Sequence, residues 1–198
     1  MSGGHRPPAS AEVHRARVQY PGGLAARYRW AGSGQSALVF SVSEVGGRLH
    51  DLGSLVAAEP DRLCRAELRI EGPLGTWSAR FASLVYDEPA GALWDTPGLL
   101  LVKYGFHVYA LGSRSGELVW SRACSTPVIA VITSPRLDHA LLQTELETLA
   151  VRTDGEVAWR AGHADVIVAA RLVAGSLLLD TYGGQQVVLD SRSGLAGT

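Results

Sequence analysis

The segment LLLVKYGFHVYALGSRSGELVW, residues 99–120, decides the fold of this chain. It begins with four apolar residues in a row, which is typical of a strand that is covered on both faces. Its centre carries Ser115-Gly116, and glycine permits the positive φ that a tight turn between two strands requires. Trp120 then ends a further short strand. The segment therefore predicts neighbouring antiparallel strands that are closed by a tryptophan.

Two later segments repeat this pattern at equal spacing. They are ALLQTELETLAVRTDGEVAW, residues 140–159, and SLLLDTYGGQQVVLDSRSG, residues 176–194. The turn glycines Gly116, Gly155 and Gly194 are separated by 39 residues in both intervals. A period of about 40–45 residues is typical of stacked blades of four strands. We expect each closing tryptophan to pack between neighbouring blades, where an aromatic ring buries about 150–250 Å².

The motif around these turns resembles the tryptophan-docking repeat of the quinoprotein-like β-propellers, whose common form is A-x-D-x-x-T-G-x-x-x-W. The resemblance covers residues 82–198 and implies a propeller-type fold for them. A quinone cofactor would also require Ca²⁺ ligands and a catalytic carboxylate beside a flat slot, and the sequence shows no such set, so we expect no cofactor. The matching residues are Ala110, Ser115, Gly116 and Trp120 in the first unit, Ala150, Gly155 and Trp159 in the second, and Asp190, Ser193 and Gly194 in the third.

The predicted organisation is all-β, with three recognisable blades and a diverged β-sheet before them. The last unit lacks its fourth strand, and LAARYRW, residues 24–30, could supply it by closing a ring. A five-bladed ring and an open stack, completed by the N-terminal sheet or by a second subunit, both fit the length. An uncovered blade edge favours self-association. The expected parts are a disordered tail at 1–10, an antiparallel β region at 11–81, and units at about 82–122, 123–162 and 163–198.

The N-terminal region alternates with a period of two. VHRARVQY, residues 13–20, and AARYRW, residues 25–30, predict a hairpin around the turn PGG. If Tyr28 and Trp30 face inward, four arginines share the outer face, where Arg65 and Arg69 could extend them. Such a face suits phosphate or an acidic partner, or is simply solvated. The candidate binding residues on it are Arg15, Arg17, Arg27 and Arg29.

Further strands are expected at SALVFSV, residues 36–42, and LCRAELRI, residues 63–70, with a short helix over Asp51–Arg62. The segment YDEPAGALWDTPG, residues 86–98, places carboxylates beside an aromatic ring, as a sugar-hydrolysing site does. It is also typical of a surface loop. If the chain is an enzyme, its catalytic residues would be Asp87, Glu88 and Asp95, and Trp94 and His107 are added as candidate binding residues.

The composition excludes several classes of protein. The chain of 198 residues has a net charge of −1, so no overall field attracts nucleic acid. Its two cysteines form neither a disulfide framework nor a zinc site. The candidate metal ligands are only doublets, so we expect no metal; they are His50 with Asp51, Asp138 with His139, and His163 with Asp165. The chain is rich in arginine and alanine and has one lysine, Lys103, which suggests a GC-rich bacterial genome. We find no signal peptide and no membrane span, so we expect a cytoplasmic location. The sequence favours a non-catalytic module that binds a protein partner; the alternatives are a hydrolase or an anion or nucleic-acid binder.

Overall fold

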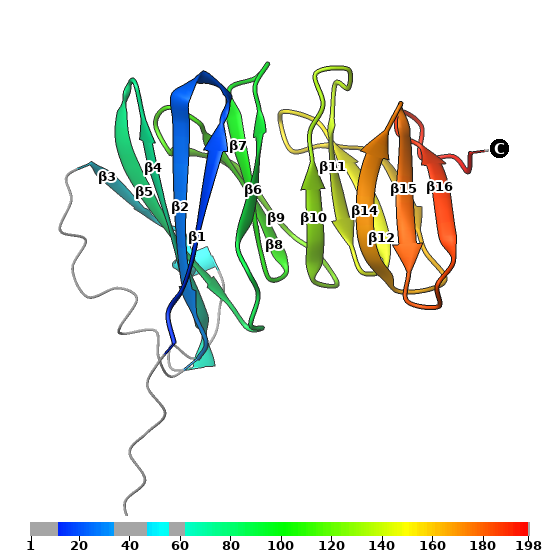
Figure 1. Ribbon diagram of the computed structural model, residues 1–198, viewed down its shortest axis with the longest axis horizontal. Helices are drawn as coiled ribbons and strands as arrows, with labels where there is room; N and C mark the ends of the chain where they lie inside the picture. Colours follow the sequence, from blue (N-terminus) through cyan, green and yellow to red (C-terminus); the bar gives the residue numbers. More distant parts are fainter. Residues whose placement is uncertain (1–11, 34–46, 56–61, 198) are drawn as a thin grey trace, which may run out of the picture.

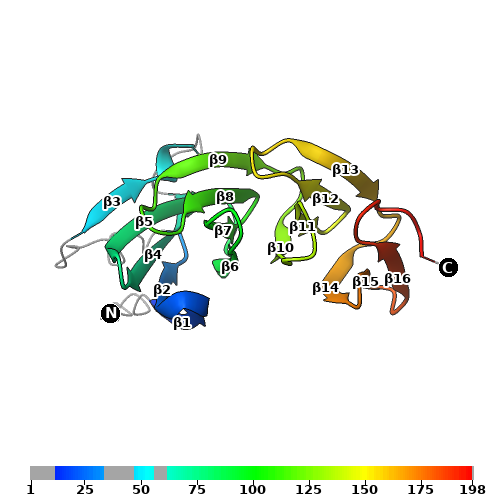
Figure 2. The ribbon, with the colours of Figure 1, turned by 90° about the horizontal axis from the view of Figure 1, so that it is seen from above.

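In the computed structural model, the described residues 12–33, 47–55 and 62–197 form four separate β-sheets. The sheets follow one another in chain order along an open arc (Figures 1 and 2), and no described strand of the first sheet pairs with the last sheet. The predicted all-β, propeller-type fold is confirmed, in its form as an open stack with an N-terminal sheet. Among the described residues, no helix is long and apolar enough to cross a membrane.

The two central sheets are blades of four antiparallel strands in chain order. Every residue of the second strand in each blade is buried, because neighbouring sheets cover both of its faces. This explains why LLLVKY and ALLQT show no alternation in the sequence. The first blade comprises β6 (Ala90–Trp94), β7 (Leu99–Tyr104), β8 (His107–Gly112) and β9 (Leu118–Ala123); the second comprises β10 (Val128–Ile132), β11 (Ala140–Thr144), β12 (Glu147–Val151) and β13 (Val157–Gly162).

The last sheet contains β14 (Ile167–Val173), β15 (Ser176–Thr181) and β16 (Gln186–Asp190). The residues that follow begin to occupy the place of a fourth strand, because the Gly197 N–H donates to the Val188 carbonyl at 2.8 Å. The prediction that residues 24–30 supply this strand is wrong. Those residues belong to the first sheet, where they pair on both sides with other N-terminal strands.

The first sheet has the strand order of a blade with one addition. The hairpin predicted from PGG is confirmed, and Pro21–Gly23 forms its turn. In the described part of the helix expected over Asp51–Arg62, Asp51 ends a strand and Gly53–Leu55 forms a 3₁₀ turn. Residues 56–61 lie outside the described part, as does the strand expected at 36–42. The antiparallel strands are β1 (His14–Tyr20), β2 (Leu24–Ala31), β4 (Cys64–Gly72) and β5 (Gly75–Ser83), and β3 (Arg48–Asp51) runs parallel to β5 at the outer edge.

A tryptophan of each of the first three sheets packs on a turn glycine of the next sheet. A Cβ atom on Gly116 would lie 2.5 Å from a ring carbon of Trp77, and one on Gly155 would lie 3.0 Å from Trp120. The contacts at Gly116 and Gly194 leave no room for a Cβ unless the ring moves, and the contact at Gly155 is tighter than ordinary packing. Packing therefore favours glycine at these positions, as does their positive φ. The three pairs are Trp77 with Gly116, Trp120 with Gly155, and Trp159 with Gly194.

Trp77 shows that the first sheet is joined to the repeats as another blade would be. Its indole N–H donates to the Ser113 carbonyl at 3.1 Å, and that of Trp120 donates to the Thr153 carbonyl at 3.0 Å. The inner face of the first sheet also forms a common core with β7 and β8, which includes Tyr28, Phe81 and Tyr109. The sheet therefore forms a continuous stack with the repeats.

Candidate functional site

The four arginines predicted to share a strand face do lie together. In the β1–β2 hairpin, Arg15 lies opposite Arg29 and Arg17 lies opposite Arg27. Residues that face each other across an antiparallel pair have Cβ atoms about 4.5–5.5 Å apart. Tyr28 and the other alternate residues of β2 point into the core, so the arginines point away from the first repeat blade. We call Arg15, Arg17, Arg27 and Arg29 the arginine face.

Two of the four guanidinium groups are held by carboxylates from β4. Arg29 pairs with Glu67 at 2.8 Å, and Arg27 pairs with Glu71 at 3.2 Å. Glu67 is buried, and it also lies 3.7 Å from Arg80. The register of β2 with β4 therefore fixes one side of the arginine face, because it places Glu67 directly opposite Arg29.

The other two guanidinium groups have no such partner. Arg15 and Arg17 are exposed, and neither forms an ion pair with any residue in the described ranges. Like charges directly opposite each other across strands are destabilising, and this hairpin contains two such pairs. The arginine face lines an open hollow of about 600 Å³. An anion bound between the facing arginines would reduce the repulsion between their positive charges.

The carboxylates proposed for hydrolysis are separated. The Asp87 carboxylate, before β6, accepts hydrogen bonds from Lys103 Nζ at 2.7 Å and from the Gly105 N–H at 2.8 Å. Asp95 lies beyond the other end of β6, and a strand of five residues spans about 17 Å. Glycosidases hold their two carboxyl groups about 5–10 Å apart. The structure therefore does not bring Asp87 and Asp95 together, and Glu88 is exposed on the surface.

The contact made by Asp87 recurs in the following blades at intervals of 39 residues. Thr126 donates to the Thr144 hydroxyl at 3.0 Å, and the Asp165 carboxylate accepts from the Gly183 N–H at 2.9 Å. Each of these residues stands just before the first strand of its sheet and binds the turn between the second and third strands. Asp87 therefore has a structural role that the repeat accounts for.

Trp94 and His107 lie at separate places in the first blade. The Trp94 ring is buried against Leu99 and Leu101, so it offers little surface to a ligand. His107 stacks on Tyr109 with ring centroids 5.9 Å apart, and burial lowers the pKa of its imidazole. Neither residue is on the strands that carry the arginine face.

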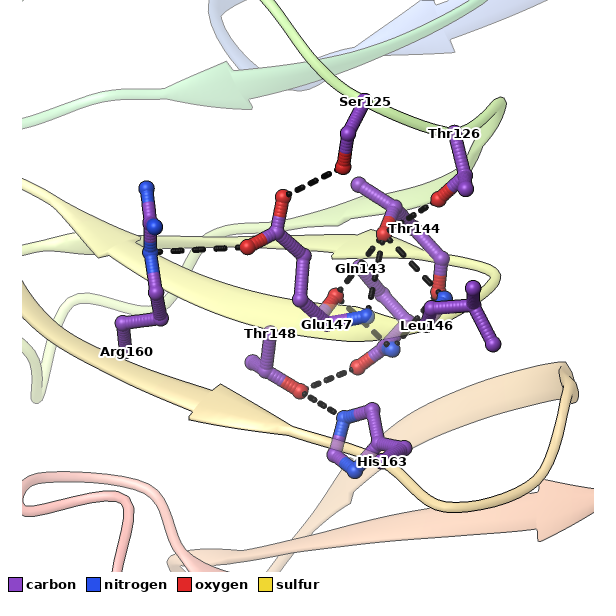
Figure 3. A network of polar contacts seen from close by, with 9 residues as sticks. All are labelled: Ser125, Thr126, Gln143, Thr144, Leu146, Glu147, Thr148, Arg160 and His163. Atoms are coloured by element: carbon purple, nitrogen blue, oxygen red, sulfur yellow. Dashed lines mark hydrogen bonds and ion pairs between the residues drawn. The ribbon is translucent and has the colours of Figure 1, made fainter.

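Figure 3 shows a polar network in the second repeat blade that the sequence did not predict. The Gln143 amide nitrogen donates to the carbonyls of Thr144 and Glu147, which turns its Oε1 toward the Thr148 hydroxyl at 2.5 Å. Because Thr148 has one hydroxyl hydrogen and donates it to Gln143, it must accept from His163 Nε2 at 2.8 Å. The hydrogen of His163 therefore sits on Nε2, and burial lowers the pKa of this ring.

The same network joins the connecting segments on both sides of the blade. Glu147 accepts from Ser125 at 3.2 Å and pairs with Arg160 at 3.4 Å (Figure 3). Burial and then the charge of Glu147 raise the pKa of the neighbouring Cys124 to about 11. The thiolate is the nucleophilic form of cysteine, so a thiol with this raised pKa is almost entirely in its unreactive protonated form at neutral pH. The hydrogen bonds and the ion pair of the network connect β11 and β12 to the segments before and after the blade. The pair Gln143-Thr144 at the end of β11 does not indicate such a network in the sequence.

No protein-family model and no curated protein matches the sequence. Among solved structures, the fold is similar to that of the dihydro-heme d1 dehydrogenase NirN in complex with DHE, with a TM-score of 0.56 and 17% identity over 70% of this chain and 34% of that chain. The Pan2 WD40 domain of Neurospora crassa has a TM-score of 0.48 and 11% identity, over 55% of this chain and 36% of that chain. A europium-containing methanol dehydrogenase has a TM-score of 0.43 and 17% identity, over 50% of this chain and 22% of that chain.

This chain spans about a third of the length of the first two of these structures. At 17% identity, the likeness to NirN shows the fold alone, and that fold is the propeller type implied by the tryptophan-docking repeat.

Proposed function

We propose that this chain is a non-catalytic binding module whose arginine face receives an acidic segment of a protein partner. The observation that carries the proposal is the exposed, unpaired state of Arg15 and Arg17 within the described residues, opposite Arg29 and Arg27. A carboxylate forms two parallel hydrogen bonds with a guanidinium group, so acidic side chains fit this face well.

The spacing of the arginines supports an extended peptide as the ligand. Arg15 and Arg17 are two residues apart on one strand, which corresponds to about 6.6 Å. Alternate side chains of an extended acidic segment repeat at the same distance. Two carboxylates on one side of such a segment would therefore each meet one cross-strand pair, Arg15 with Arg29 or Arg17 with Arg27. The underlying sheet is rigid, and it therefore presents the arginines at a fixed separation.

A protein partner is favoured over nucleic acid by the neighbours of the arginine face. Tyr28 points into the core, so the face lacks the aromatic platform on which bases stack. The separation of Asp87 from Asp95 speaks against the hydrolase alternative. The bacterial origin, the cytoplasmic location and self-association at an open blade edge stay predictions.

The test measures the binding of a fluorescently labelled oligo-glutamate peptide by anisotropy at low salt. We expect the double variant Arg15→Gln/Arg17→Gln to bind about 2- to 30-fold more weakly than the unaltered protein, since each exposed ion pair contributes about 0.2–1 kcal/mol. Because exposed charges are screened, added salt should weaken binding to the unaltered protein.

The matched control is Arg136→Gln/Arg152→Gln, which removes the same charge from two exposed arginines of the second repeat blade. The proposal fails if this control weakens binding as much as the double variant, or if the unaltered protein does not bind the peptide. Tighter binding of a single-stranded oligonucleotide than of the peptide would replace the protein partner by nucleic acid.

A further inference from the structure

A second candidate site lies between the first sheet and the first repeat blade. One wall is formed by the β1–β2 and β4–β5 turns, and the other by the residues that follow β6 and β8. The cleft has a volume of about 350 Å³. Small-molecule sites in proteins have volumes of about 300–1,000 Å³, so the cleft is large enough for a compact ligand.

The lining of this cleft is largely apolar and is fixed in place. Ile70 and Trp77 are buried, and Leu24 and Leu93 are half-buried beside them. Trp77 is held by its hydrogen bond to the Ser113 carbonyl at 3.1 Å and by its packing on the following turn. Because the walls are already ordered, a ligand would lose little free energy in organising them.

Two opposite charges face the same cleft without neutralising each other. Asp95 and Arg114 both line it and are both exposed. Neither side chain forms an ion pair with the other or with any residue in the described part of the chain. An apolar cavity with a few polar groups at its edge is the usual form of a ligand site. Here these groups complement one positive and one negative charge on the ligand.

The junction between the last two sheets offers a comparison within the same molecule. The turn SRSG at 113–116 recurs at 191–194, and it lines a second cleft of about 330 Å³ between the last two sheets. That cleft is lined by Leu137, Leu172, Arg136 and Arg192 with several serines, and no tryptophan lines it. Its one carboxylate, Asp190, is held by the N–H groups of its own turn at 3.1 and 2.9 Å. The repeat therefore explains the turn, but it does not explain the tryptophan lining or the unpaired Asp95.

We propose that the cleft between the first sheet and the first repeat blade binds a small zwitterion with an apolar body, of the class of the aromatic and branched α-amino acids. Asp95 receives the ammonium group, Arg114 receives the carboxylate, and the apolar body packs against the half-buried Leu24 and Leu93. This site is separate from the arginine face, so it does not depend on the function proposed above.

The test compares three probes by two-dimensional NMR of the ¹⁵N-labelled protein, with the Trp77 indole N–H as reporter. L-Phenylalanine carries both charges, phenethylamine carries only the positive charge, and 3-phenylpropionate carries only the negative charge. We expect L-phenylalanine to bind about 1.4- to 5-fold more tightly than either analogue, since each analogue loses one ion pair with an exposed side chain and such a pair contributes about that factor.

Two variants assign the charges, and a third is the control. Asp95→Asn should weaken the binding of L-phenylalanine by about 1.4- to 5-fold without weakening that of 3-phenylpropionate. Arg114→Gln should weaken the binding of L-phenylalanine without weakening that of phenethylamine. Arg192→Gln, at the equivalent turn, should change nothing. The proposal is overturned if L-phenylalanine gives no saturable shifts, if the three probes bind alike, or if Arg192→Gln weakens binding as much as Arg114→Gln.

Discussion

Replacing Gly116 by alanine tests the packing of each tryptophan on the next sheet. The new Cβ would lie 2.5 Å from Cε3 and 2.6 Å from Cδ2 of Trp77, so the ring must move. Overpacking of this kind costs about 1–3 kcal/mol. Gly116 also has a φ of 74°, where a residue with a Cβ costs about 1–2 kcal/mol more. We expect Gly116→Ala to lower the free energy of unfolding by about 2–5 kcal/mol, out of roughly 5–15 kcal/mol for a typical domain.

Gly22→Ala is the matched control, because Gly22 has a φ of 73° and a Cβ there would meet nothing within 4 Å. It should lose only the conformational part, about 1–2 kcal/mol. Equilibrium unfolding in urea, followed by tryptophan fluorescence and circular dichroism, measures both values. The reasoning is refuted if the two variants lose the same stability to within about 0.5 kcal/mol, since the docking contact would then contribute nothing.

Three further predictions concern the polar network and its surroundings. Thr148→Val leaves Gln143 Oε1 and His163 Nε2 without a partner, so urea unfolding should show a loss of about 1–3 kcal/mol that Thr148→Ser largely avoids. Burial lowers the pKa of His163 in the folded state, so the unfolded chain binds more protons than the folded one as the pH falls from about 7 to 5, and the folded state loses stability. His163→Gln should make this loss of stability smaller. An unchanged dependence of stability on pH in this variant would contradict the assignment. The Cys124 thiol, with its pKa of about 11, should react with iodoacetamide at about pH 8 roughly a hundredfold more slowly in the folded protein than in urea, as mass spectrometry of the modified peptide can show.

The blades were predictable because each repeat must satisfy the same two requirements. A turn between strands needs a residue that accepts positive φ, and the neighbouring tryptophan needs a position without a side chain. Gly116, Gly155 and Gly194 meet both requirements, so their interval of 39 residues carries structural information. The apolar runs at β7 and β11 likewise follow from burial on both faces.

The role of the first sheet could not be predicted in the same way. In β5, Gly75 precedes Trp77 by two residues, whereas Gly116 precedes Trp120 by four, so the motif is lost although the docking contact remains. Residues 32–63 also separate β2 from β4 in the chain. The idea that β2 closes a ring failed because a short turn pairs it with β1, and short connections cost less entropy than pairing of distant segments.

The sequence was enough to predict which residues form the arginine face, but not which of these arginines form ion pairs. Alternation of period two is enough to place Arg15, Arg17 and their neighbours on one face. Which of them is neutralised depends on the register between β2 and β4, which positions Glu67 and which the sequence pattern does not determine. The separation of Asp87 from Asp95 was missed because AGALW has few of the residue types that indicate a strand.

The most direct test of the proposed function exchanges the charge of the arginine face. The unaltered protein should bind an oligo-glutamate peptide and not an oligo-lysine peptide, as measured by isothermal titration calorimetry at low salt. In Arg15→Glu/Arg17→Glu we expect the preference to be lost or reversed, because the two arginines of the arginine face that form no ion pair within the described residues are replaced by carboxylates. A double variant that folds normally and still prefers oligo-glutamate with unchanged affinity would contradict the assignment of this face as the binding site.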